Sequence, residues 1–386
     1  MINKNFAVIT KDRNNTLDIL RLMAAVFVIL NHSYPLTGNI GILCGVLGGG
    51  IAVGTFFTIS GYVIAQSWFS DPTPSRFLWK RVLRLVPGLV AVVIFTIFII
   101  GPINTSLSLQ EYFFNIHTWM YLLVILLFRP IRTLPGVFIL NAYPTAVNGS
   151  LWTIPLEFRM YILLCLMGMI GMLKNRKIFL SIVILTCTIY IYSILLPVWP
   201  VNILTNAFGY IYINEYILHT VNAGIPLDYP PYNLLFCIGT LFYLYKDQIK
   251  FNNGLALVAA IGLLVSSISF SIVSANVSYL LIAILICLPY LVLYLGQLPI
   301  KQLYNIGDRY GDYSYGLYIY AFPVQQTIAH FMPKISPIPM FALSLPTTFI
   351  FAYSSWWLLE KKALSLKKRE PKKIFLDTFT YIKNIT

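Results

Sequence analysis

Charged side chains are scarce in this sequence. Only 10% of its 386 residues are Asp, Glu, Lys or Arg, whereas 58% are hydrophobic. Because a soluble domain carries roughly 25% charged residues, this chain lacks the charge to cover a water-facing surface. Histidine is also rare, and the five cysteines lie in or beside apolar runs without metal-ligand spacing. The composition therefore excludes a soluble globule and a disulfide scaffold, and no metal site is expected.

Long apolar runs divide the chain. Because a helix needs about 20 mostly apolar residues to cross ~30 Å of hydrocarbon, we predict an all-α integral membrane protein with about ten transmembrane helices. They form one domain, 17–360, between a cytoplasmic segment, 1–16, and a basic cytoplasmic tail, 361–386. A shorter run, 119–128, is predicted to be re-entrant or interfacial. The predicted spans are 17–36, 45–68, 82–101, 151–173, 178–197, 230–245, 254–273, 277–295, 313–332 and 338–359.

Positive residues alternate with these spans. If the N-terminus is cytoplasmic, 23 of the 27 Lys and Arg residues fall in or beside cytoplasmic segments. Since cytoplasmic loops are enriched in Lys and Arg, the pattern places both termini in the cytoplasm. The net charge of +14 is therefore mainly a topology signal. We expect the tail to contact anionic lipid and expect no nucleic-acid partner.

Two ionisable residues lie on the first predicted span. Arg21 is near its cytoplasmic end, and His32 follows eleven residues later, about 16 Å along a helix and on nearly the same face. Asp18 is spaced to pair with Arg21. A neutral imidazole accepts a hydroxyl proton near neutral pH, so His32 is a candidate general base. The alternative is an interfacial histidine bonded to backbone.

The second, third and fourth spans open with further signals. Glycines of the stretch 38–64 permit close approach between helices or toward a ligand. Arg81 and Arg84 share one face of the third span, either as snorkelling charges or as an anion clamp. Glu157 and Arg159 enter the fourth span on different faces, so each needs another partner. For Glu157 this is an ion pair with another helix or a functional contact.

Five patterns in order give a resemblance to the membrane-bound acyltransferase-3 family, the integral-membrane O-acetyltransferases of bacterial surface glycans. LDILRLMAAVFVILNH ends at His32 and FFTISGYVI covers 56–64. Arg81, Arg84 and Pro87 match RxxRxxP, and SLWTIPLE ends at Glu157. SYGLYIYAFPV, at 314–324, has alanine where many relatives have histidine, so we assign that helix no catalytic base.

The resemblance implies transfer of an acyl group, usually acetyl from cytoplasmic acetyl-CoA, to a hydroxyl of an extracytoplasmic polysaccharide or its lipid-linked precursor. The membrane would be the bacterial inner membrane, and any extracytoplasmic hand-off partner would be a separate polypeptide. His32 and Glu157 are the catalytic candidates, and direct transfer and an acetyl-histidine intermediate both remain open. The donor candidates are Arg21, Arg81 and Arg84; the acceptor candidates are Ser150, Trp152, Tyr315 and Tyr318.

Two other classes explain part of the sequence. A transporter of a glycan or small anion accounts for ten helices and intramembrane charge, but not for the five ordered patterns. A glycan polymerase or ligase accounts for long outside segments such as 198–229.

The charge distribution predicts accessibility. Cysteines introduced near Asn5 and near Lys372 should be shielded in intact cells from a membrane-impermeant thiol reagent, whereas one near Asn148 should react. Labelling of either terminal position would contradict the ten-span topology.

Overall fold

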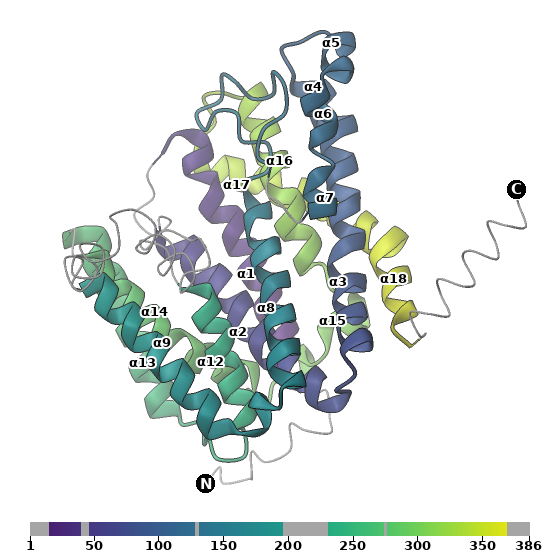
Figure 1. Ribbon diagram of the computed structural model, residues 1–386. Coiled ribbons are helices and arrows are strands. Elements are labelled where there is room, and N and C mark those ends of the chain that lie inside the picture. The colour runs from purple at the N-terminus through teal and green to yellow at the C-terminus, as the bar shows by residue number, and fades with distance from the viewer. Residues whose placement is uncertain (1–14, 40–45, 128–130, 196–230, 274–275, 369–386) are drawn as a thin grey trace, which may run out of the picture. The chain divides into compact units, whose positions relative to one another are not determined.

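The chain folds into helices joined by turns and loops (Figure 1). The computed structural model describes residues 15–39, 46–127, 131–195, 231–273 and 276–368. Within those ranges no strand forms, and the prediction of an all-α protein is confirmed. Most of the predicted cytoplasmic segment, 1–16, lies outside the described residues, as do the outer segment 198–229 and much of the tail.

A helix lies at each predicted span. Seven helical stretches of the described chain are long and apolar enough to cross a membrane. Helix α12 has 13 residues, about 20 Å, which is shorter than the hydrocarbon core. The count of ten therefore stays a prediction, as does the placement of the termini. The helices are α1 (Leu17–Ser33), α2 (Val46–Ser70), α3 (Pro74–Phe95), α8 (Thr153–Met169), α9 (Arg176–Leu195), α12 (Tyr232–Leu244), α13 (Asn253–Val273), α14 (Val277–Gly296), α16 (Ser314–Phe331) and α17 (Pro337–Ser355).

Helix α3 continues beyond its predicted span. A π-helical turn (Thr96–Ile100) and α4 (Gly101–Asn104) extend it to a 31-residue helical stretch. The hydroxyl of Tyr112 donates to the carbonyl of Ile97 at 3.0 Å and satisfies part of the irregular turn. The predicted re-entrant run that follows divides between α6 (Ile116–Met120) and α7 (Leu123–Leu127), each too short to span.

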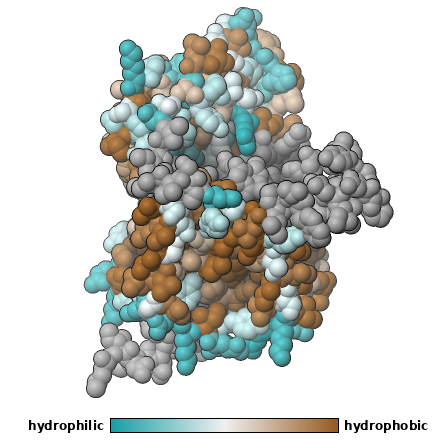
Figure 2. All heavy atoms as spheres, turned by 90° about the vertical axis from the view of Figure 1, so that its left-hand side faces the viewer, coloured by the Kyte–Doolittle hydropathy of each residue, from teal (hydrophilic) through white to brown (hydrophobic). Residues whose placement is uncertain are grey.

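The chain forms two compact units, each built from separate stretches of sequence. The first unit comprises residues 1–31, 40–66 and 170–310, and the second comprises 32–39, 67–169 and 311–386. In the first unit, α13 packs along α14, and α9 and α12 pack against α14. Large apolar side chains such as Leu257, Val258 and Leu264 are exposed on α13. Figure 2 shows brown apolar side chains gathered on this side above a hydrophilic lower edge, as expected of a lipid-facing surface.

The second unit is organised around α16. This helix packs along α17 and also contacts α3 and a short 3-10 helix, η3 (Gly149–Trp152), while α8 packs on α3. Residues 314–326 of α16 are all buried, including Gln325 and Gln326. Helix α17 runs on through a π-helical turn, η6 (Trp356–Glu360), into α18 (Lys361–Ser365). The core of this unit therefore includes two buried glutamine amides.

Glycine permits a close crossing of α2 and α12 in the first unit. A Cβ at Gly61 would overlap the carbonyl oxygen of Phe236, and one at Gly239 would overlap that of Thr58. The hydroxyl of Thr240 also donates to the carbonyl of Gly61 at 3.1 Å. Of the two roles open to glycine in α2, close helix packing is therefore the one that Gly61 fulfils.

Gly61→Ala should destabilise the protein by about 1–3 kcal/mol, because the added methyl group has no space at this crossing. Thermal unfolding in detergent should show a clearly lower midpoint. Gly262→Ala is the matched control, since its Cβ would lie 3.3 Å from the Cys287 sulfur and requires only a small adjustment. Equal midpoints for the two variants would contradict the close crossing.

Candidate functional site

His32 lies in the last turn of α1, against the middle of α16. Its ring meets the Phe322 ring edge-on, with centroids 5.2 Å apart. The Nδ1 atom is buried and has no hydrogen-bond partner among the described residues. Next to it, the buried Ser33 hydroxyl accepts a hydrogen bond from Gln325 at 2.9 Å. The imidazole is therefore held by packing, and Nδ1 is not engaged by the described part of the chain.

The start of the fourth predicted span reaches the same place. A Cβ at Gly149 would lie 2.6 Å from the Phe322 ring, so glycine lets η3 approach the residue that packs on His32. Ser150 is buried, and its hydroxyl has no hydrogen-bond partner among the described residues. Asn148 anchors the turn by donating to the carbonyl of Ile319 at 2.8 Å. Ser150 and Trp152 therefore lie on η3, the short helix that packs against Phe322, and Phe322 in turn packs against His32.

Tyr318, also predicted to be near the acceptor, lies on α16 with its hydroxyl 2.9 Å from that of Thr153. Thr153 is the first residue of α8, directly after Trp152. Tyr318 therefore joins α16 to the beginning of α8.

Arg81 and Arg84 lie on α3 with different partners. Arg81 donates to the hydroxyl of Ser67 at 3.0 Å, and its guanidinium lies over the rings of Phe77 and Tyr161, 5.6 and 5.9 Å from their centroids. Tyr161 in turn donates a hydrogen bond to Glu157. The partner of Glu157 was expected on another helix or in a functional contact, whereas Tyr161 lies one turn further along α8 itself.

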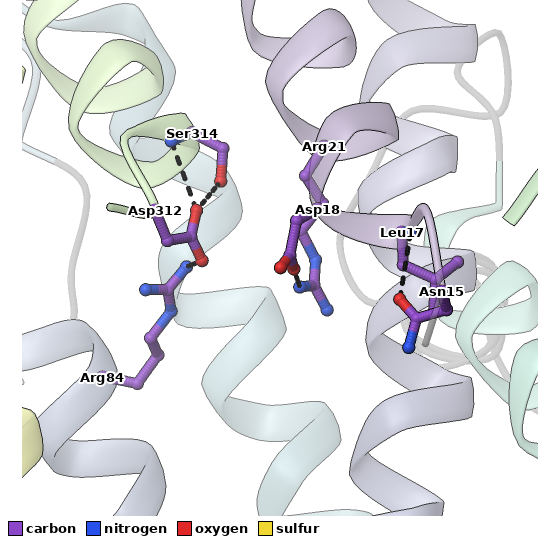
Figure 3. Close-up of polar contacts among 7 residues, drawn as sticks. All are labelled: Asn15, Leu17, Asp18, Arg21, Arg84, Asp312 and Ser314. Carbon is purple, nitrogen blue, oxygen red and sulfur yellow. Dashed lines mark hydrogen bonds and ion pairs between the residues drawn. The ribbon is translucent and has the colours of Figure 1, made fainter. Parts of the chain in front are cut away.

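Arg84 forms an ion pair with Asp312, with 2.6 Å between Nη2 and Oδ2 (Figure 3). Both side chains are about one-fifth exposed. The guanidinium also lies over the Tyr315 ring, 5.8 Å from its centroid, and the Tyr315 hydroxyl donates to the carbonyl of Leu85. Tyr315, predicted to bind the acceptor, is therefore placed beside the arginine.

Glu360 adds an acidic group to this region. It is 2% exposed, and its Oε1 accepts a hydrogen bond from Ser355 at 2.7 Å. Its Oε2 has no hydrogen-bond partner in the described chain. The carboxylates of Asp312, Glu360 and Glu157 all interact electrostatically with Arg84. Arg84 is thus set among three carboxylates.

Arg21 belongs to the first unit. It pairs with Asp18 one turn earlier on α1, at 3.3 Å, as its spacing predicted (Figure 3). Its assignment to the donor stays a prediction. Arg159, the other charge of the fourth predicted span, is exposed and donates to the carbonyl of Pro155.

Asp312, Glu360 and Phe322 were not identified from the sequence. Asp312 precedes the SYG pattern by two residues, and Glu360 ends an apolar run just past the last predicted span. An acidic residue at such a boundary is a usable signal, because carboxylates are costly in the membrane. Phe322 lies within the pattern at 314–324, but nothing in that pattern singles it out as a neighbour of His32.

Comparison with known proteins adds to this geometry. The acyltransferase-domain family model, acyltransferase family 3, matches residues 14–357. An O-acetyl transferase of Shigella phage Sf6 is 28% identical over 382 residues, 95% of this chain and 99% of the phage protein. Nodulation protein 10 of Rhizobium leguminosarum bv. viciae is 27% identical over 162 residues, 39% of this chain and 43% of that protein. No solved structure matches the chain.

Gln326 should stabilise the loop at residues 141–146, which lies beside the candidate site. Its buried amide donates to the carbonyls of Tyr143 and Ala146 and accepts from Asn141. Gln326→Leu would leave the two carbonyls unpaired, each at about 1–3 kcal/mol, whereas Asn141 keeps its bond to the backbone carbonyl of residue 326. We expect a lower unfolding midpoint and faster proteolysis between residues 131 and 148. The exposed Gln302→Leu serves as control, and unchanged proteolysis in Gln326→Leu would contradict this role.

Proposed function

The chain belongs to the acyltransferase-3 family, and on that premise we propose that it transfers an acetyl group from cytoplasmic acetyl-CoA to an extracytoplasmic glycan hydroxyl. The acceptor is a surface polysaccharide or its lipid-linked precursor, at a bacterial inner membrane. The observation that carries the proposal is that α16 joins two candidate sites in the second unit. Tyr315, at its start, lies against Arg84, and Phe322, about 10 Å further along the helix, packs on His32.

The arginine end suits the donor. Coenzyme A carries several phosphates, and the planar guanidinium binds phosphate through paired hydrogen bonds. Arg81 and Arg84 would hold these phosphates, one over Phe77 and Tyr161 and the other over Tyr315. The long, thin pantetheine arm would then follow α16 and bring the thioester toward His32.

The histidine end suits the chemistry. His32 would remove the proton from the acceptor hydroxyl as the oxygen attacks the thioester carbonyl. The carbon–sulfur bond then breaks, and the imidazolium returns the proton to the departing thiolate. Trp152 offers an aromatic face to the sugar and Ser150 a hydroxyl donor, both from η3. Glu157 acts through Tyr161 as a positioning residue.

Radiolabelled acetyl-CoA tests the reaction with the purified protein and candidate glycans. Label transferred to the glycan supports the enzyme. Movement of glycan or anion across proteoliposomes without label transfer would instead support a transporter.

His32→Gln should lower the rate of acetyl transfer by about 10²–10⁴-fold, because an amide forms hydrogen bonds but does not accept the proton. The protein should still insert, remain monodisperse in detergent and bind acetyl-CoA. His117→Gln is the control, since His117 is exposed on α6, and it should keep most of the activity. Near-normal turnover in His32→Gln would contradict the proposed role of the imidazole as general base.

A further inference from the structure

We propose that Asp312 occupies the position on Arg84 that a donor phosphate takes, so that donor binding exchanges a carboxylate for a phosphate. Asp312 then sets the affinity for the donor. The proposal rests on the proposed function and assigns a role to a residue that belongs to none of the sequence patterns.

The bond between Asp312 and Arg84 has the geometry of an anion site. The 2.6 Å separation of Oδ2 and Nη2 is that of a strong, charge-assisted hydrogen bond. A phosphate oxygen forms the same kind of bond to a guanidinium. Arg84 is still about one-fifth exposed, so an anion is able to approach it.

Asp312 is placed where it is able to move. It lies between α15 (Ile306–Tyr310) and α16, directly after Gly311, whose φ of +113° few other residues adopt. A linker residue moves at lower cost than a residue inside a packed helix. Its other oxygen, Oδ1, accepts from the Ser314 hydroxyl at 2.6 Å and from the Ser314 amide at 3.4 Å. These two bonds favour the paired position.

Joint binding of phosphate and Asp312 is electrostatically unfavourable. Arg84 already interacts with the carboxylates of Asp312, Glu360 and Glu157, and Arg81, one turn earlier on α3, adds a second positive charge. A phosphate placed beside Asp312 would bring two anions together at a partly buried site, which is costly. Exchange removes that repulsion and leaves Arg84 paired at every stage.

The test is the affinity of the purified full-length protein for coenzyme A, measured by calorimetry in detergent. Asp312→Asn should bind about tenfold more tightly, which corresponds to about 1.4 kcal/mol. One charge-assisted hydrogen bond no longer competes with the ligand. Coenzyme A should also raise the unfolding midpoint of this variant more than that of the wild type, because its Arg84 lacks the anionic partner until ligand binds.

Asp71→Asn is the matched control. This substitution also removes one negative charge from a carboxylate. Asp71 lies between two candidate spans, Gly49–Ser70 and Pro74–Asn104, and pairs with Lys80 and Arg76 of α3. The hydrogen bond from Lys80 lowers the pKa of Asp71 below its usual range, so this carboxylate is ionised at neutral pH. The affinity of this variant for coenzyme A should stay within about twofold of wild type, because Asp71 pairs with Lys80 and Arg76 and not with Arg84. Equal tightening in both variants would show a general charge effect and overturn the exchange.

Other outcomes separate the two proposals. Unchanged or weaker binding in Asp312→Asn, with a normal wild type, would overturn the exchange and make Asp312 a support for Arg84. A wild type that does not bind coenzyme A would instead contradict the proposed function. If the Asp312→Asn protein does not fold, the same measurement is made on the Ser314→Ala variant. Losing the hydroxyl bond to Asp312 should tighten binding about threefold, and an unchanged affinity would overturn the exchange.

Discussion

The cost of placing ionised groups in a low-dielectric environment governs the second unit. An isolated charge at membrane depth is expensive, so each one needs a partner or a ligand. Arg84 is paired with Asp312 and lies over Tyr315, and Arg81 is bonded to Ser67 between two aromatic rings. Removing one member of such a set leaves the other uncompensated. Arg84 therefore links α3 to the start of α16, and Arg81 links α3 to α2 and α8.

Helix α16 connects the two ends of the site through contacts of different kinds. At its start the contacts are ionic and aromatic, through Asp312 and Tyr315. In its middle they are packing contacts, through Phe322 against His32. Further along, Gln325 and Gln326 bond Ser33 and the loop at 141–146. A buried glutamine amide satisfies several backbone groups at once, which keeps this loop ordered beside the catalytic candidate.

Small residues allow the approaches on which both units depend. Gly61 and Gly239 let α2 and α12 cross in the first unit, and Gly149 lets η3 reach Phe322 in the second. Association of helices in lipid relies on packing and polar contacts, because the tails are as apolar as leucine. The glycine-rich second span indicated close approach either between helices or toward a ligand, and at Gly61 the structure shows packing between helices.

The sequence by itself determined what depends on composition and on near neighbours. Apolar runs specified where ten helices lie, because each run is a local property, and Asp18 with Arg21 was predictable from i, i+3 spacing. His32 and the two arginines were found because ionisable residues are conspicuous in apolar runs and the ordered patterns name them. The short length of α12 and the extension of α3 were not predicted, since hydropathy locates apolar residues and says little about where helical backbone ends.

Only the tertiary structure decided which residues meet. Arg84 and Asp312 are 228 positions apart, Gln325 and Ser33 are 292 apart, and no spacing rule relates them. Phe322 became part of the site because α16 turns it toward His32, which its residue type does not reveal. Asp312 shows the same limit: in sequence it is one acidic residue before a helix, and in the fold it is the partner of the arginine that the donor would need. Long-range pairing depends on how helices pack, and that arrangement is a property of the whole chain.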